Sequence, residues 1–100
     1  MTAAEVTHVT VLVPRTLMSV AGEQRTLEVE IGDSTSIAAL LDGLAARYPV
    51  FDRRVRDETG AVRRYVNVYV DGEDIRQLDG VATVLEPGQQ VRIIQSVAGG

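Results

Sequence analysis

Residues 32–49 read "GDSTSIAALLDGLAARYP", and the spacing of their apolar side chains predicts one amphipathic helix. The apolar positions recur every three or four residues and form a single stripe: Ile37, Leu40, Leu41, Leu44, Ala45 and Tyr48. Asp33, Ser34 and Thr35 are candidate N-caps, and Pro49 is expected to end the helix. Because such a helix cannot bury its stripe alone, we expect a sheet to pack against it.

On both sides of this helix, apolar and polar residues alternate with the period of half-buried strands. Before it, residues 9–14 and 25–32 form two strands that we expect to make a hairpin, with a turn around Gly22. The side chains expected to face the helix are Val9, Val11, Val13, Leu27, Val29, Ile31, Val66, Val68, Val70, Val91 and Ile93.

The second half of the chain contains the remaining strands. Residues 50–64 carry mixed charges and predict a long loop, with a short helical turn near Phe51 to Val55. A strand then runs to the turn signal Asp71-Gly72. A short apolar strand is expected from Val81, before a Pro87-Gly88 turn and the last strand.

This order of elements predicts an α+β fold of the β-grasp, or ubiquitin-like, type, with a mixed sheet of about five strands packed on one main helix. In that arrangement the last strand lies centrally, beside the first. We therefore expect one domain over residues 1–95, followed by a flexible C-terminal tail, residues 96–100, that leaves from a central strand.

Composition narrows the possible functions. The 100 residues include no Cys, which excludes thiolate metal sites, iron–sulfur clusters and catalytic thiols, and the single His8 cannot build a metal site alone. The net charge of −4 argues against nucleic acid as a partner. No apolar run approaches the roughly 20 residues of a membrane span, so we expect a cytoplasmic protein. We expect no catalytic residue, no metal ligand and no bound cofactor.

The sequence ends in "QSVAGG", and the two glycines raise a chemical possibility. A narrow end without Cβ atoms at Gly99 and Gly100 could thread into the active site of another enzyme. Its reactive group would be the Gly100 carboxylate. A carboxylate is a poor electrophile, but conversion to an acyl adenylate with ATP would let a sulfur nucleophile displace AMP and leave a thiocarboxylate.

Residues 64–100, "RYVNVYVDGEDIRQLDGVATVLEPGQQVRIIQSVAGG", resemble the ubiquitin-like sulfur carriers of the MoaD/ThiS family and are particularly similar to the CysO branch of actinobacteria. The family's functional Gly-Gly falls on Gly99 and Gly100. The resemblance implies a MoeB/ThiF-type adenylating enzyme that uses ATP, and a sulfurtransferase as the sulfur source. It also implies an acceptor, either a pyridoxal-phosphate-dependent cysteine synthase or a synthase of another thio-metabolite.

Partner binding is expected on the sheet face opposite the helix. With a ubiquitin-like strand order, this docking face would comprise Leu12, Asn67, Tyr69, Arg92 and Ile94, and the tail would contribute Val97 and Ala98. Two alternatives remain open. The chain could be a ubiquitin-like modifier joined to other proteins through Gly100, or a β-grasp interaction module whose tail has no chemical role.

Overall fold

The predicted helix is present as α1, Ile37–Arg47, in the computed structural model, which describes residues 7–96. Its N-cap is Ser36, whose Oγ accepts a hydrogen bond of 3.1 Å from the backbone N–H of Ala39. The three candidate caps, Asp33, Ser34 and Thr35, were therefore placed too early. The Thr35 hydroxyl instead closes a turn with both backbone groups of Gly32.

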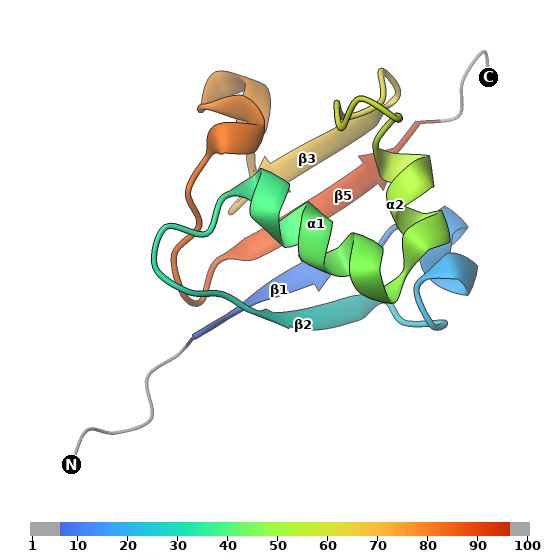
Figure 1. Cartoon of the computed structure of the whole chain (residues 1–100), viewed down its shortest axis with the longest axis horizontal. Coiled ribbons are helices and arrows are strands. Elements are labelled where there is room, and N and C mark those ends of the chain that lie inside the picture. The colour runs from blue at the N-terminus through green and yellow to red at the C-terminus, as the bar shows by residue number, and fades with distance from the viewer. Residues whose placement is uncertain (1–6, 97–100) are drawn as a thin grey trace.

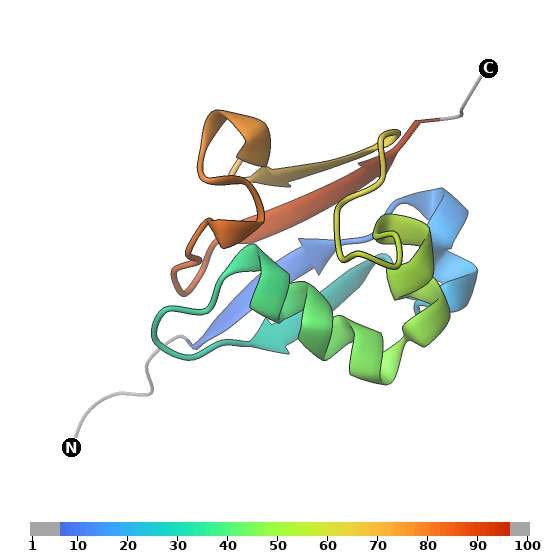
Figure 2. The same cartoon turned by 45° about the horizontal axis from the view of Figure 1, so that its top comes forward.

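Five strands form one mixed sheet in the order β2-β1-β5-β3-β4. β5 lies in the centre, parallel to β1 and antiparallel to β3, as the β-grasp prediction requires. Both helices cover one face of this sheet (Figures 1 and 2). The strands are β1 His8–Leu12, β2 Thr26–Glu30, β3 Val66–Val70, β4 Glu73–Asp74 and β5 Gln90–Gln95.

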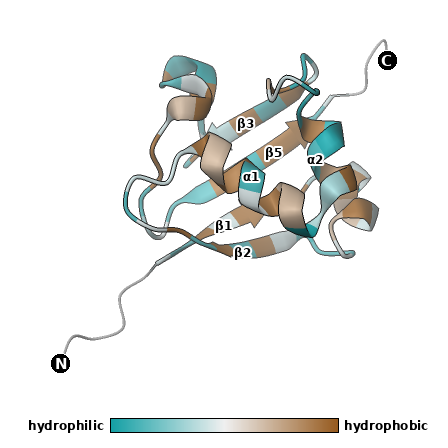
Figure 3. Cartoon of the chain, viewed as in Figure 1, coloured by the Kyte–Doolittle hydropathy of each residue, from teal (hydrophilic) through white to brown (hydrophobic). Residues whose placement is uncertain are grey.

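The core lies between the sheet and α1, where the alternating strands meet the helical stripe (Figure 3). All side chains predicted to face the helix are buried except Val29, which is half-buried on the edge strand β2. The stripe itself is buried at Ile37, Leu40, Leu41 and Leu44. None of the helices within residues 7–96 is long and apolar enough to cross a membrane.

The predicted loop at 50–64 begins with a second helix, α2, Pro49–Val55, so the expected helical turn is real but longer. Pro49 ends α1 and also opens α2, a position where its missing N–H costs nothing. Phe51 and Val55 extend the core, and Arg56 joins the two helices through ion pairs to Asp42 (2.9 Å) and Asp52 (2.7 Å).

Two other connections differ from the sequence-based prediction. The link between β1 and β2 is not a short hairpin connection, because a 3₁₀ helix, Arg15–Val20, precedes the turn at Gly22 and buries Leu17. The short strand is β4, which directly follows the Asp71-Gly72 turn. The stretch from Val81 was wrongly assigned as a strand, since it lies in a 3₁₀ turn, Gly80–Ala82.

Candidate docking face and tail exit

The central strand β5 leads directly to the C-terminal residues. Beyond the end of β5, the backbone N–H of Ser96 donates a 2.8 Å hydrogen bond to the Tyr65 carbonyl, so the sheet holds the chain up to that residue. The predicted tail residues Val97, Ala98, Gly99 and Gly100 lie outside the described residues. The last described residue, Ser96, therefore lies beside the start of β3, at the end of the sheet to which the β5 arrowhead points in Figure 1.

The predicted docking face forms one contiguous set on the sheet. Arg92 on β5 lies opposite Tyr69 of β3 and opposite Leu12 of β1, so these three residues form one row across the sheet. Ile94 and Asn67 form the next row, nearer the tail. Ile94 is 38% exposed although it is a large aliphatic side chain. The structure thus brings the five residues together, while their role in docking stays a prediction.

Asn67 is held in place by a residue that the sequence reasoning missed. Arg76 donates from Nη2 to Asn67 Oδ1 (2.9 Å) and pairs with Asp74 Oδ2 (2.7 Å). The side-chain hydrogen bond from Arg76 is the main cause that lowers the pKa of the Asp74 carboxyl. In the sequence, Arg76 stands out only because it closely follows the Asp71-Gly72 turn. The fold is needed to show that the Arg76 side chain reaches Asn67 on β3.

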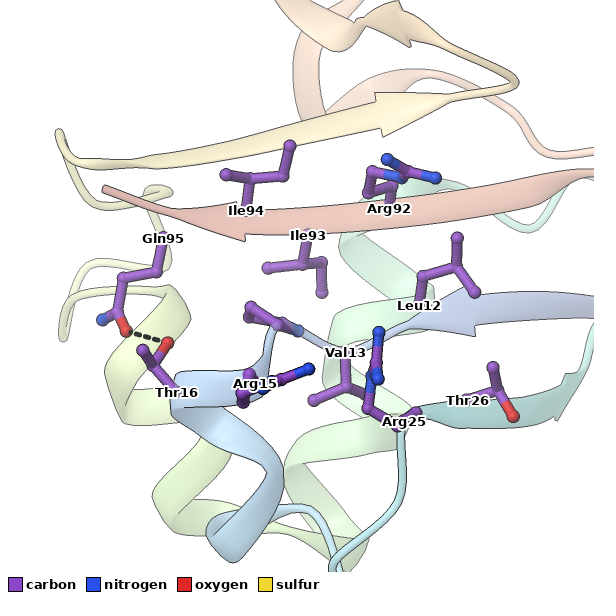
Figure 4. A pocket seen from close by; sticks show the side chains of 11 residues that line it. Leu12, Val13, Arg15, Thr16, Arg25, Thr26, Arg92, Ile93, Ile94 and Gln95 are labelled. Carbon is purple, nitrogen blue, oxygen red and sulfur yellow. Dashed lines mark hydrogen bonds between the residues drawn. The ribbon is translucent and has the colours of Figure 1, made fainter. Parts of the chain in front are cut away.

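A groove of about 380 Å³ lies beside this face, next to the exit of the chain. Figure 4 shows it between the end of β5 and the 3₁₀ helix, where the Thr16 hydroxyl donates to Gln95 Oε1 at 2.8 Å. Sequence reasoning missed this groove because it took the β1–β2 link for a short turn. The lining residues are Leu12, Val13, Pro14, Arg15, Thr16, Arg25, Thr26, Arg92, Ile93, Ile94 and Gln95.

The remaining ionisable groups show no catalytic arrangement in the part of the chain that the structure describes. Within residues 7–96, no three His, Asp or Glu side chains gather closely enough to hold a metal ion. His8 is exposed on β1. Burial lowers the pKa of Arg56, but the hydrogen bonds that its guanidinium donates to Asp52 and Asp42 outweigh this effect, so that pKa lies above its ordinary value.

Comparison with known proteins agrees with this geometry. The profile of the ThiS family matches residues 11–100. The sulfur carrier protein CysO of Mycobacterium tuberculosis is 36% identical over 95 residues, which cover 93% of this chain and 99% of the relative. The small archaeal modifier protein 3 of Haloferax volcanii is 33% identical over 77 residues, 77% of this chain and 83% of the relative.

Solved structures show the same fold. The crystal structure of M. tuberculosis CysO superposes with a TM-score of 0.77 at 34% identity, covering 89% of this chain and 99% of that one. A CysO of Amycolatopsis orientalis, solved in complex with BexX, matches with a TM-score of 0.76 at 30% identity, covering 92% of this chain and 99% of that one.

Proposed function

The chain belongs to the ThiS family of ubiquitin-like sulfur carriers, and from this premise we propose that the Gly100 carboxylate is the group that carries sulfur. It is a CysO-like protein in sequence and in fold. The observation that carries the proposal is the position of β5, which contributes two residues to the docking face and leads from there to the tail.

The proposed chemistry needs two steps. A Gly100 carboxylate oxygen attacks the α-phosphorus of ATP in the active site of a MoeB/ThiF-type enzyme, and pyrophosphate leaves. A hydrosulfide ion then attacks the acyl carbon, displaces AMP and loses its proton, which leaves a terminal thiocarboxylate. Where the sulfur is supplied as the persulfide of a sulfurtransferase, the first product is an acyl disulfide, and a thiol must cleave it, forming a disulfide, to release the same thiocarboxylate. The chain is a co-substrate in both steps, and its partners supply the catalysis.

The described residues contribute recognition. Leu12 and Ile94 provide apolar area, while Asn67 and Arg92 provide polar groups that fix the orientation of a partner. A face of this kind would hold the partner while the tail reaches its active site. The thiocarboxylate would then pass its sulfur to an acceptor biosynthetic enzyme, such as a cysteine synthase or another thio-metabolite synthase. The solved complex of A. orientalis CysO with BexX supports a protein as partner.

Intact mass tests the proposal directly. The chain is incubated with ATP, sulfide and the MoeB/ThiF-type enzyme of the same organism. We expect it to gain the mass difference between one sulfur and one oxygen atom. The matched controls are Gly100 deletion and Gly99→Val. The deletion withdraws the carboxylate by about 3.6 Å, and a displacement near 1 Å already costs about a hundredfold in rate. An unchanged mass for the wild-type chain, or full activity of the deletion variant, would refute the proposal.

A second function is favoured by the similarity to an archaeal modifier protein. A modifier uses the same activated Gly100 carboxylate but joins it to amines of other proteins. The two functions separate in an ATP-supplied extract that contains an affinity-tagged chain. Covalent adducts of higher mass that disappear with Gly100 deletion indicate a modifier, whereas a thiocarboxylate without adducts indicates a carrier alone. An interaction module would give neither product.

A further inference from the structure

The groove beside the tail exit carries an unusual distribution of charge. Three of its lining residues are arginines, Arg15, Arg25 and Arg92, and none is Asp or Glu. All three side chains are exposed and form no ion pair with any residue in 7–96. Arg56 and Arg76, in contrast, each pair with a nearby carboxylate.

The backbone brings these three arginines together from separate parts of the chain. Arg15 opens the 3₁₀ helix, Arg25 precedes β2, and Arg92 lies on β5. The Arg25 carbonyl accepts a 2.7 Å hydrogen bond from the Val13 N–H, which fixes the β1 side of the groove to the β2 side. In Figure 4, the side chains of Arg15 and Arg25 extend into the same space. This arrangement concentrates positive charge on an otherwise acidic protein.

Charge is also divided along the outer face of the sheet. Thr26 pairs with Leu12 at the end nearer the groove, whereas Glu28 and Glu30 follow along β2 toward the other end. The Glu28 carboxylate accepts a hydrogen bond from Thr10 and lies outside the groove lining. A partner that matches both ends of this face can bind in one orientation only, because the reversed orientation would bring like charges together.

We propose that this groove binds an acidic segment of the activating partner, whose carboxylates pair with Arg15, Arg25 and Arg92. The inference rests on the proposed function, because it assigns the groove to the enzyme that receives the tail. Guanidinium groups match carboxylates in planar, two-bonded geometry. The groove shares Leu12, Arg92 and Ile94 with the docking face, so one partner can cover both. The net charge of −4 favours an acidic protein segment, bound locally, over a long polyanion.

Kinetics with matched charge reversals test the inference. Arg15→Glu combined with Arg25→Glu reverses two charges in the groove, whereas Arg47→Glu combined with Arg54→Glu reverses two exposed charges on the helices. At about 50 mM salt, the groove variant should lose roughly tenfold or more in kcat/KM for adenylation, through KM, and the deficit should shrink to about twofold near 500 mM. The helix variant should stay within about twofold of wild type.

Equal losses in both variants, or no loss in the groove variant, would overturn the inference while the proposed function stands. If the wild-type chain is not adenylated at all, the proposed function fails, and a direct titration still decides the nature of the groove. Hexaglutamate should shift the NMR signals of the Arg15 and Arg25 guanidinium groups, while hexalysine should not. No shift with hexaglutamate, equal shifts at Arg47 and Arg54, or tighter binding of a single-stranded DNA hexamer would each reject an acidic protein segment.

Discussion

Ile93 and Ile94 are the same residue type at neighbouring positions of β5, yet one is 1% exposed and the other 38%. Ile93 points to α1 and belongs to the core, whereas Ile94 lies on the open face opposite Asn67. Alternation along a strand places them on opposite sides of the sheet. The difference teaches that the two faces of this one strand are separated in role, because its inner side chains are buried in the core and its outer ones stay exposed to solvent.

The largest expected effect is a loss of stability when a side chain on the core-facing side of β5 is truncated. Ile93→Ala should reduce the free energy of unfolding by about 2–5 kcal/mol, and Leu41→Ala, on the facing helix, by a similar amount, since both leave a cavity in the core. Ile94→Ala is the matched control and should change stability by less than about 0.5 kcal/mol. Denaturant unfolding measures all three. Equal losses at Ile93 and Ile94 would contradict the separation of the two faces.

A smaller loss of stability is expected on the helical side, away from the open face. Arg56→Met removes the buried guanidinium that ties Asp42 of α1 to Asp52 of α2. Because Asp42 is well exposed, the unfolding free energy should fall by only about 1–3 kcal/mol. Adenylation at a temperature where the variant is folded should stay at the wild-type rate. A selective loss of adenylation would show that the helices also take part in recognition.

The outer face is tested by adding charge to it. Ile94→Asp should lower kcat/KM for adenylation roughly tenfold, equivalent to about 1.4 kcal/mol, because a carboxylate would have to be buried against the partner. Thermal unfolding should be unchanged, since the side chain lies outside the core. Wild-type adenylation kinetics in this variant would remove Ile94 from the docking face.

The smallest effect concerns pH. Hydrogen bonds from the Thr59 hydroxyl and backbone lower the pKa of the Asp57 carboxyl. A group with a lowered folded-state pKa stabilises the fold fully above its unfolded pKa, near 4, and loses that contribution as the pH falls through its folded value. In Asp57→Asn, the free energy of unfolding should therefore decrease slightly less steeply below about pH 4 than it does in the wild type. Urea unfolding measures the free energy of unfolding at each pH. An equally steep fall below about pH 4 in the variant and in the wild type would contradict this contribution of Asp57.

Sequence reasoning found the fold because its strongest patterns are periodic. The stripe from Ile37 to Leu44 and the alternation in β1, β3 and β5 each repeat often enough to identify an element and its buried face. The shorter elements gave no such signal. β4 has two residues, and α2 has seven and begins at the proline that appeared to end the preceding helix.

The candidate site, too, could be predicted only in part from the sequence. The grouping of the five residues of the predicted docking face followed from alternation combined with a ubiquitin-like strand order, since those two together decide which side chains become neighbours. The arginine groove could not be predicted, because Arg15 and Arg25 meet only through the path of a 3₁₀ helix that buries a single Leu17. Arg76 likewise depends on a two-residue strand that returns it toward Asn67.

The hydrogen bond from Ser96 to Tyr65 has a consequence for how fast a docked partner can find its target. Gly100 lies four residues beyond Ser96, so its carbonyl can lie at most roughly 14 Å from Ser96. If a partner binds the sheet face, as we propose, the Gly100 carboxylate is thereby confined to that small volume instead of bulk solution. Short tethers of this kind give local concentrations on the order of millimolar or higher. On the proposed function, a weak and easily reversible encounter would therefore be enough for the reaction, and the chain could leave one enzyme for the next.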